Sequence, residues 1–179
     1  YDMFYGERNL RDGAIYKASY DLGWTKFFPF PPEHYGWVVE IDPFSRKKRK
    51  LVSLGRCAHE CATVKVLKDN RIVVYTGDDI DNGCLYKFIS KSQGDLTHGK
   101  LYVASLEKKK WIEISYQKHK SLQKKFKNQI EVLTYLRESA KLIGGTELDR
   151  PEDIEIDPFN DNVIIALTNN YSKQVMHGS

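Results

Sequence analysis

The sequence has few cysteines and no long apolar run, and each shortage excludes a class of protein. Its 179 residues include three cysteines, Cys57, Cys61 and Cys84, which cannot all pair within one chain, so we expect free, partly buried thiols. Cys57, His59 and Cys61 are soft metal ligands, but a structural zinc site needs four ligands, usually as two spaced pairs. No segment approaches the ~20 apolar residues of a transmembrane helix, so we expect no membrane span.

The composition is typical of a globular protein. Hydrophobic residues make up 41% of the chain, aromatic residues 12% and charged residues 29%, which argues against disorder. The net charge of +4 hides a local asymmetry, because eight lysines lie within residues 108–127 and seven acids within residues 146–161. A lysine run most often forms a solvated face, and no nucleic-acid-binding motif accompanies this one. We therefore expect no nucleic acid partner.

Short segments of β-branched and aromatic residues dominate the chain and end at Gly, Pro, Asp or Asn. The expected strands lie at residues 36–41, 51–54, 61–67, 71–76, 83–89, 100–106, 111–115, 151–157 and 162–168. Such short strands, with turns between them, are typical of antiparallel all-β architectures.

One segment, residues 122–143, departs from this rhythm. Its apolar residues are three or four positions apart and neither Gly nor Pro interrupts them, which predicts an inserted amphipathic helix. Gly144 and Gly145 supply its C-terminal stop.

The five residues EIDPF occur twice, at 40–44 and 155–159, each time where a strand pattern reaches a turn. Similar β-hairpin units reused around a ring explain this repeat, and repeated four-stranded modules indicate a β-propeller. Because each blade takes ~40–50 residues, the chain corresponds to about three to four blades. A ring closes with about four to eight blades, so we expect residues 1–179 to be a partial propeller, truncated at both ends.

Polar side chains cluster at the ends of several expected strands. Residues 55–60 (GRCAHE) place an arginine, a histidine and a carboxylate in a turn, and residues 75–79 (YTGDD) place paired carboxylates after an apolar strand. Carboxylates that converge from different strands are suitable oxygen ligands for a hard cation such as Ca²⁺. The residues alone favour a simpler interpretation, a turn in which Asp78 and Asp79 accept hydrogen bonds from backbone N–H groups.

A third cluster lies at residues 149–155 (DRPEDIE). Pro151 should hold Arg150 in extended geometry, and in an extended strand Arg150 and Glu152 share a face opposite Asp153. An arginine and a carboxylate on one face suit an anion and a metal ion respectively. A plain surface ion pair is the alternative.

Seven segments, taken in order, resemble consecutive motifs of the PhoX-type alkaline phosphatases. They are residues 36–43 (GWVVEIDP), 55–60 (GRCAHE), 75–79 (YTGDD), 85–88 (LYKF), 101–104 (LYVA), 150–153 (RPED) and 166–170 (ALTNN). Each motif is weak alone, but together they follow the family's order and cover nearly the whole chain from Gly36. The expected helix also resembles the segment that this family inserts before its RPED-like motif.

The resemblance implies part of a six-bladed β-propeller whose central channel holds an iron–calcium cluster (Fe³⁺ and Ca²⁺) and hydrolyses small-molecule phosphate monoesters. Carried over by motif, the carboxylate ligands of the metals are Glu60, Asp79 and Glu152. Arg150 is the residue expected to bind the phosphate. The neighbours with a subordinate expected role are His59, Asp78 and Asp153. By the same resemblance we expect a monomer in the periplasm or outside the cell.

The sequence also departs from the family. The family's upstream motif, a cysteine iron ligand with adjacent glutamates, has no match here, and Cys57 lies in the wrong motif to replace that cysteine. The first residue is Tyr1, no twin-arginine signal is present, and the chain stops where the family continues. We therefore expect little phosphatase activity from this polypeptide alone. The alternative hypothesis is a non-catalytic, propeller-like domain that serves binding or assembly.

Overall fold

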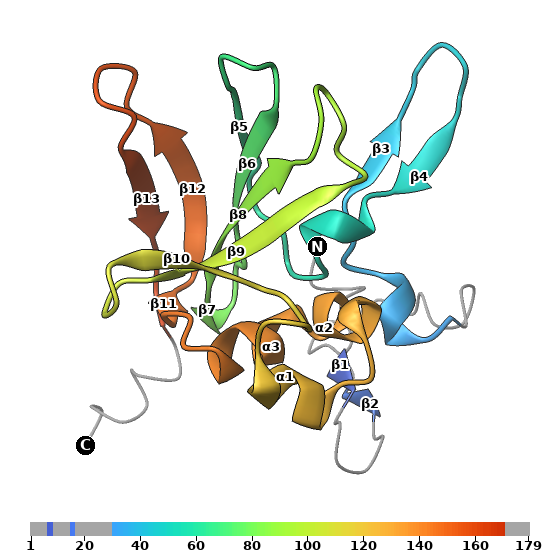
Figure 1. The fold of residues 1–179 in the computed structure, drawn as a ribbon, viewed down its shortest axis with the longest axis vertical. Helices are drawn as coiled ribbons and strands as arrows, with labels where there is room; N and C mark the ends of the chain where they lie inside the picture. Colours follow the sequence, from blue (N-terminus) through green and yellow to red (C-terminus); the bar gives the residue numbers. More distant parts are fainter. Residues whose placement is uncertain (1–6, 9–14, 17–29, 171–179) are drawn as a thin grey trace.

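A five-stranded antiparallel sheet forms the centre of the computed structural model, which describes residues 7–8, 15–16 and 30–170 (Figure 1). The order of its strands is β10-β9-β8-β6-β5. They are β5 (Thr63–Val66), β6 (Ile72–Gly77), β8 (Leu85–Ser90), β9 (Gly99–Ser105) and β10 (Lys110–Glu113). Each of these five strands pairs with the next of the five along the chain, as in a β-meander. Residues 81–83, between β6 and β8, are not part of this sheet.

Small two-stranded units surround this sheet. Two of them are hairpins, β3 (Val39–Ile41) with β4 (Lys48–Lys50), and β12 (Pro151–Ile156) with β13 (Val163–Leu167). The shorter pairs are β1 (Glu7–Arg8) with β2 (Ile15–Tyr16), and β7 (Asp81–Gly83) with β11 (Leu148–Asp149). Two short 3₁₀ helices are η3 (Pro32–His34) and η4 (Val52–Leu54). The β12–β13 and β3–β4 hairpins stand on either side of β5 and β6 (Figure 1).

The predicted single helix at residues 122–143 is wrong, because three short helices occupy the segment. They are α1 (Lys120–Lys125), α2 (Gln129–Thr134) and α3 (Leu136–Leu142). The first break follows from Asn128, whose side chain accepts a hydrogen bond from the Glu131 N–H over 3.0 Å and so starts a new helix. The Glu131 carboxylate in turn accepts from the Lys127 N–H over 2.7 Å. Most of the apolar stripe is still buried, including Phe126, Leu133, Leu136 and Ala140, whereas Ile130 is exposed.

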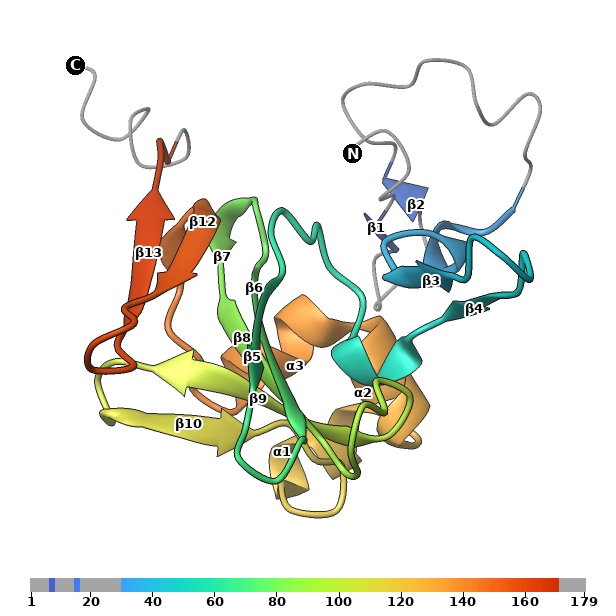
Figure 2. The same cartoon turned by 90° about the horizontal axis from the view of Figure 1, so that it is seen from above.

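The central sheet buries both of its faces. On one face Tyr86, Phe88, Leu101 and Val103 pack against the three helices, which contribute the buried residues Leu122, Phe126, Val132, Leu133, Leu136 and Ala140. On the other face Leu85 and Ala104 pack against Ile154 of the β12–β13 hairpin. The helices and this hairpin thus lie on opposite sides of the sheet (Figure 2). The period-2 alternation along β8 and β9 produces the two cores.

The repeated EIDPF segments form two matching hairpin turns, which confirms that the repeat marks similar β-hairpins. Asp42 and Asp157 each accept a hydrogen bond of 2.9 Å from the N–H two residues later. Their own N–H groups donate across the turn, each over 2.9 Å. Both phenylalanines, Phe44 and Phe159, are 95% exposed.

The fold is mostly β with few helices, as expected for an all-β protein, and its sheets do not close into a ring within the part of the chain that is described. The strand expected at residues 51–54 is wrong, because Val52–Leu54 forms a 3₁₀ helix that buries Leu54. Among the described residues, no helix is long and apolar enough to cross a membrane.

We expect Leu136→Ala to lower the free energy of unfolding by about 2–5 kcal/mol, because the side chain is fully buried between the helices and the sheet. Leu142→Ala, in the same helix, is the control, since Leu142 is 41% exposed and should lose about 0.5 kcal/mol. Urea denaturation of the purified variants measures both losses, and equal losses would contradict this view of the core.

Candidate functional site

Two short antiparallel segments, residues 58–60 and 77–79, carry four of the seven residues that the sequence analysis singled out. Two backbone hydrogen bonds of 3.0 and 3.4 Å join the segments, and His59 faces Asp78 as a β-bridge between them. The first segment follows the core residue Cys57, and the second continues β6 beyond its last residue. The register of the sheet therefore fixes the place of both segments.

Alternation of side chains divides the four residues between two faces. His59 and Asp78 point into the core and are 7% and 0% exposed. Glu60 is exposed, and Asp79 is partly exposed with a side-chain exposure of 12%. Glu60 and Asp79 thus lie on the outer face, away from the core on which the helices pack.

On the inner face, the Asp78 carboxylate accepts two hydrogen bonds from Arg137 of α3. The Arg137 Nε and Nη2 atoms lie 2.6 and 2.7 Å from its two oxygens. The Ala58 N–H donates to Oδ1 of the same carboxylate over 2.9 Å. Asp78 therefore joins the helical segment to both site segments.

His59 is fully engaged within the protein. Its Nε2 lies 3.0 Å from the Gly55 carbonyl oxygen and its Nδ1 lies 3.0 Å from Thr76 Oγ1. Because a carbonyl can only accept, Nε2 carries the proton and Nδ1 accepts from the Thr76 hydroxyl. Burial lowers the pKa of His59, which favours this neutral form.

On the outer face, Arg150 joins two of the predicted carboxylates. Its Nε and Nη2 atoms donate to the two oxygens of Asp79, both over 2.9 Å. The same Nη2 lies 3.5 Å from Glu152 Oε1, and Glu152 also accepts from the Thr168 hydroxyl over 3.2 Å. The structure therefore brings Arg150, Asp79 and Glu152 together from the end of β6 and the start of β12.

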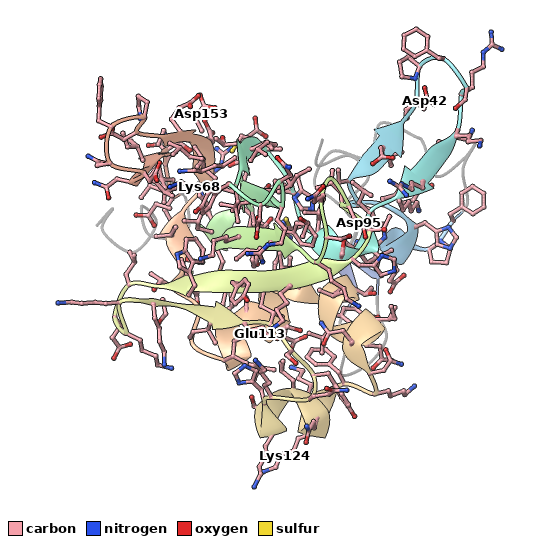
Figure 3. All side chains as sticks on the ribbon, turned by 45° about the horizontal axis from the view of Figure 1, so that its top comes forward. Asp42, Lys68, Asp95, Glu113, Lys124 and Asp153 are labelled. Atoms are coloured by element: carbon pink, nitrogen blue, oxygen red, sulfur yellow. The ribbon has the colours of Figure 1, made fainter. Side chains whose placement is uncertain are left out.

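The backbone of Arg150 differs from the expected extended geometry. Its φ is +50°, in the left-handed region that non-glycine residues rarely adopt. The β12–β13 pairing also shifts register between Pro151 and Ile154. Despite this, Arg150 and Glu152 share a face, as the alternation predicted. Asp153 is exposed and lies at the β12–β13 end of the molecule, far from Lys124 on α1 (Figure 3).

Gly77 allows β12 to approach β6 at this point. A Cβ atom on Gly77 would lie 2.2 Å from the Pro151 carbonyl oxygen, a distance that backbone atoms cannot accommodate without moving. Because Gly77 has no side chain, the backbone of Pro151 can contact β6. This contact places the neighbouring Arg150 within reach of Asp79.

Glu60 lines a cavity of about 840 Å³. The other walls come from the β3 region and the neighbouring cysteines, and they include Phe30, His34, Tyr35, Trp37, Cys57 and Cys61.

All three cysteines are free thiols, as the odd count predicted. Cys57 and Cys84 are buried and Cys61 is partly exposed.

The carboxylates of the outer face are of the right chemical kind for calcium and iron, which both accept carboxylate oxygens. Within the residues that the structure describes, however, no three His, Cys, Asp or Glu side chains converge on one point. Both oxygens of Asp79 accept hydrogen bonds from Arg150. The donors therefore fit such a metal group in kind, and in this structure Asp79 is paired with Arg150.

The sequence analysis missed Arg137, Thr168 and Gly77. Arg137 directly follows Leu136 of the apolar stripe, and this position was the one sequence feature that indicated an inward-facing side chain. Thr168 stood inside the ALTNN motif, but no role at the site was expected for it. Gly77 stood inside the GDD triplet, but its role depends on the distant Pro151.

Two comparisons place the chain among known proteins. The model of the family "Alkaline phosphatase PhoX" matches residues 5–179. A solved structure, Pseudomonas fluorescens PhoX in complex with vanadate, a transition state analogue, is similar to this chain with 34% sequence identity and a TM-score of 0.71. The similarity covers 86% of this chain and 32% of that one, so this chain spans about a third of its length. A search of curated proteins gives no match.

We expect Gly77→Ala to destabilise the protein by about 1–3 kcal/mol, because the added methyl group forces β12 away from β6. Ala166→Ser is the control, since it changes an exposed residue of the partner strand β13. Thermal unfolding followed by circular dichroism measures both. A Gly77→Ala protein as stable as the control would refute the close approach.

Proposed function

The chain belongs to the alkaline phosphatase PhoX family, and on this premise we propose that it supplies part of the active site of a metal-dependent phosphate monoester hydrolase. The observation that carries the proposal is the grouping of Arg150, Asp79 and Glu152 on one partly exposed face. The similar structure from Pseudomonas fluorescens holds vanadate, a transition state analogue, which supports phosphoryl chemistry in this family.

Arg150 is the phosphate-binding residue in this proposal. Its planar guanidinium offers parallel N–H donors, which match two oxygens of a phosphoryl group as well as they match a carboxylate. Asp79 occupies that fork in the structure. The phosphate therefore takes the place of one carboxylate partner, and Glu152, 3.5 Å from Arg150 Nη2, keeps the guanidinium oriented.

Glu60, Asp79 and Glu152 are the proposed ligands of Ca²⁺ and Fe³⁺, in keeping with their oxygen donors and outward position. When bound, such a metal group neutralises phosphate charge and stabilises the attacking and leaving oxygens. Without it, the Asp79 and Glu152 carboxylates flank Arg150, and two negative charges beside one positive charge repel an anion. His59 and Asp78 act from the inner face, and Asp153 flanks the site on the solvent side.

The proposal extends to the whole protein. We propose that it closes a six-bladed β-propeller, to which residues 1–179 contribute three to four blades, and that it works as a monomer in the periplasm or outside the cell. The repeated EIDPF hairpins and the separate small sheets support this arrangement. The competing hypothesis, a non-catalytic binding or scaffold domain, predicts neither metal binding nor hydrolysis.

We expect the whole protein, purified with its metals, to hydrolyse p-nitrophenyl phosphate, and a metal-stripped preparation to lose this activity. Metal-stripped protein should also fail to bind inorganic phosphate in a calorimetric titration until Ca²⁺ is added, because the carboxylates repel the anion. Elemental analysis measures iron and calcium directly. Absence of both metals together with absence of hydrolysis would refute the enzyme and leave the scaffold hypothesis.

We expect Arg150→Ala to keep its metals but to lose about 100-fold in kcat/KM and most of its phosphate affinity, because the phosphoryl oxygens lose two donors. Glu60→Gln and Glu152→Gln should each lower the metal content instead. Glu155→Gln, an exposed change on the same strand as Glu152, is the control and should alter neither. If Arg150→Ala left phosphate inhibition unchanged, the assignment of Arg150 would be wrong.

A further inference from the structure

Arg137 and Asp78 form an ion pair inside the protein that the proposed chemistry does not use. The Asp78 side chain is 0% exposed and that of Arg137 is 13% exposed. The two residues are 59 positions apart, and Arg137 comes from α3, in the helical segment between β10 and β11. Both donors of the guanidinium fork meet the carboxylate, at 2.6 and 2.7 Å, which fixes the plane of the carboxylate as well as its position.

Asp78 has contacts with three parts of the chain at once. Its carboxylate binds Arg137 and accepts from the Ala58 N–H, and its own N–H donates to the Cys84 carbonyl oxygen over 3.1 Å. The Asp79 N–H in turn donates to the Ala58 carbonyl oxygen over 3.0 Å. Ala58 is therefore held on one side by Asp78 and on the other by Asp79. A tilt of the Asp78 carboxylate moves the backbone from which Asp79 projects.

The residues around this pair are buried, with Cys57, Cys84 and Tyr86 at most 1% exposed. Burial raises the pKa of Cys84 to about 12 and raises that of Cys57 and Tyr86 well above the usual range, and the negative charge of Asp78 adds to all three effects. In such a place an ion pair gives little stability, because desolvation of two charges offsets their attraction. The pair instead fixes the orientation of the Asp78 carboxylate, because the two guanidinium donors of Arg137 bind its two oxygens.

We propose that Arg137 and Asp78 are positioning residues for the metal and phosphate site, acting through the backbone of residues 58–60 and 77–79 to aim Glu60 and Asp79 outward. This inference rests on the function proposed above. The helical segment 120–142 thereby has a role at the site through the contact of Arg137 with Asp78 on the inner face.

The test uses the whole protein with the variants Arg137→Gln, Arg137→Lys, Asp78→Asn and the double variant Asp78→Asn/Arg137→Gln. Lys141→Gln is the matched control, because Lys141 is a cation of the same helix whose 3.1 Å ion pair with Glu147 lies on the surface. Each protein is stripped of metal, and calorimetry then gives its dissociation constant for Ca²⁺. Melting temperature, kcat and KM are measured for the reloaded proteins, well below the melting temperature of every variant.

We expect Arg137→Gln to weaken Ca²⁺ binding by about 10–100-fold and to lower kcat, as removal of the partners that orient metal ligands usually does. Arg137→Lys, which keeps the charge but not the fork, should recover part of the Ca²⁺ affinity. The double variant should lose no more affinity than Arg137→Gln, since the two residues act as one unit. Lys141→Gln should match the wild type in every measurement.

A purely structural pair gives a different result. In that case the melting temperature falls while the Ca²⁺ dissociation constant and kcat of the folded variants stay at wild-type values, which would overturn the inference. If Arg137→Gln does not fold, the comparison of Arg137→Lys with Lys141→Gln decides, because wild-type Ca²⁺ affinity in Arg137→Lys also overturns it. A wild-type protein without Ca²⁺ binding or hydrolysis would instead overturn the proposed function, and this inference with it.

Discussion

The antiparallel pairing of residues 58–60 with residues 77–79 is the constraint on which the rest of the site depends. It fixes the register of the two segments where they leave the buried sheet. The alternation of side chains along each segment then decides which of them face the core. A slip of one residue would exchange the faces, placing Asp79 inside and Asp78 outside. The core around Tyr86 and Phe88 prevents this slip, because it holds β6 and β8 in one register.

Two neighbouring aspartates each bind an arginine from a later part of the chain. Asp78 binds Arg137 in the core, and Asp79 binds Arg150 at the surface, through the same two-donor geometry. The two pairs differ in their surroundings, and this difference separates their roles. In the inner pair the Asp78 carboxylate is fully buried, so its part is to orient the chain. The outer pair is partly exposed, so either partner can exchange the other for a cation or an anion.

Much of the fold could be predicted from the sequence, because it depends on local patterns. The β-type runs became strands at most of the expected positions, and the EIDPF repeat gave two matching turns. The single helix failed because the apolar spacing does not register a cap inside the segment, and the side chain of Asn128 caps a new helix there. Two contacts could not be predicted from the sequence, that of Arg137 with Asp78 and that of Gly77 with Pro151. Both join segments that are distant in the sequence, and only the tertiary packing brings such segments together.

The sequence left two interpretations of residues 77–79 open, a local turn and a cation site. The local turn is wrong for Asp78, which accepts a hydrogen bond from the Ala58 N–H of a separate segment, across a β-bridge. Asp79 lies on the other face, beside Arg150, and its role as a metal ligand stays a prediction. The two orientations depend on each other. A strand that ends by projecting one carboxylate outward turns the preceding side chain inward, and when that residue is also an aspartate the core must supply a cation for it. Arg137 is that cation, which is why a residue of the helical segment belongs in any physical account of the outer face.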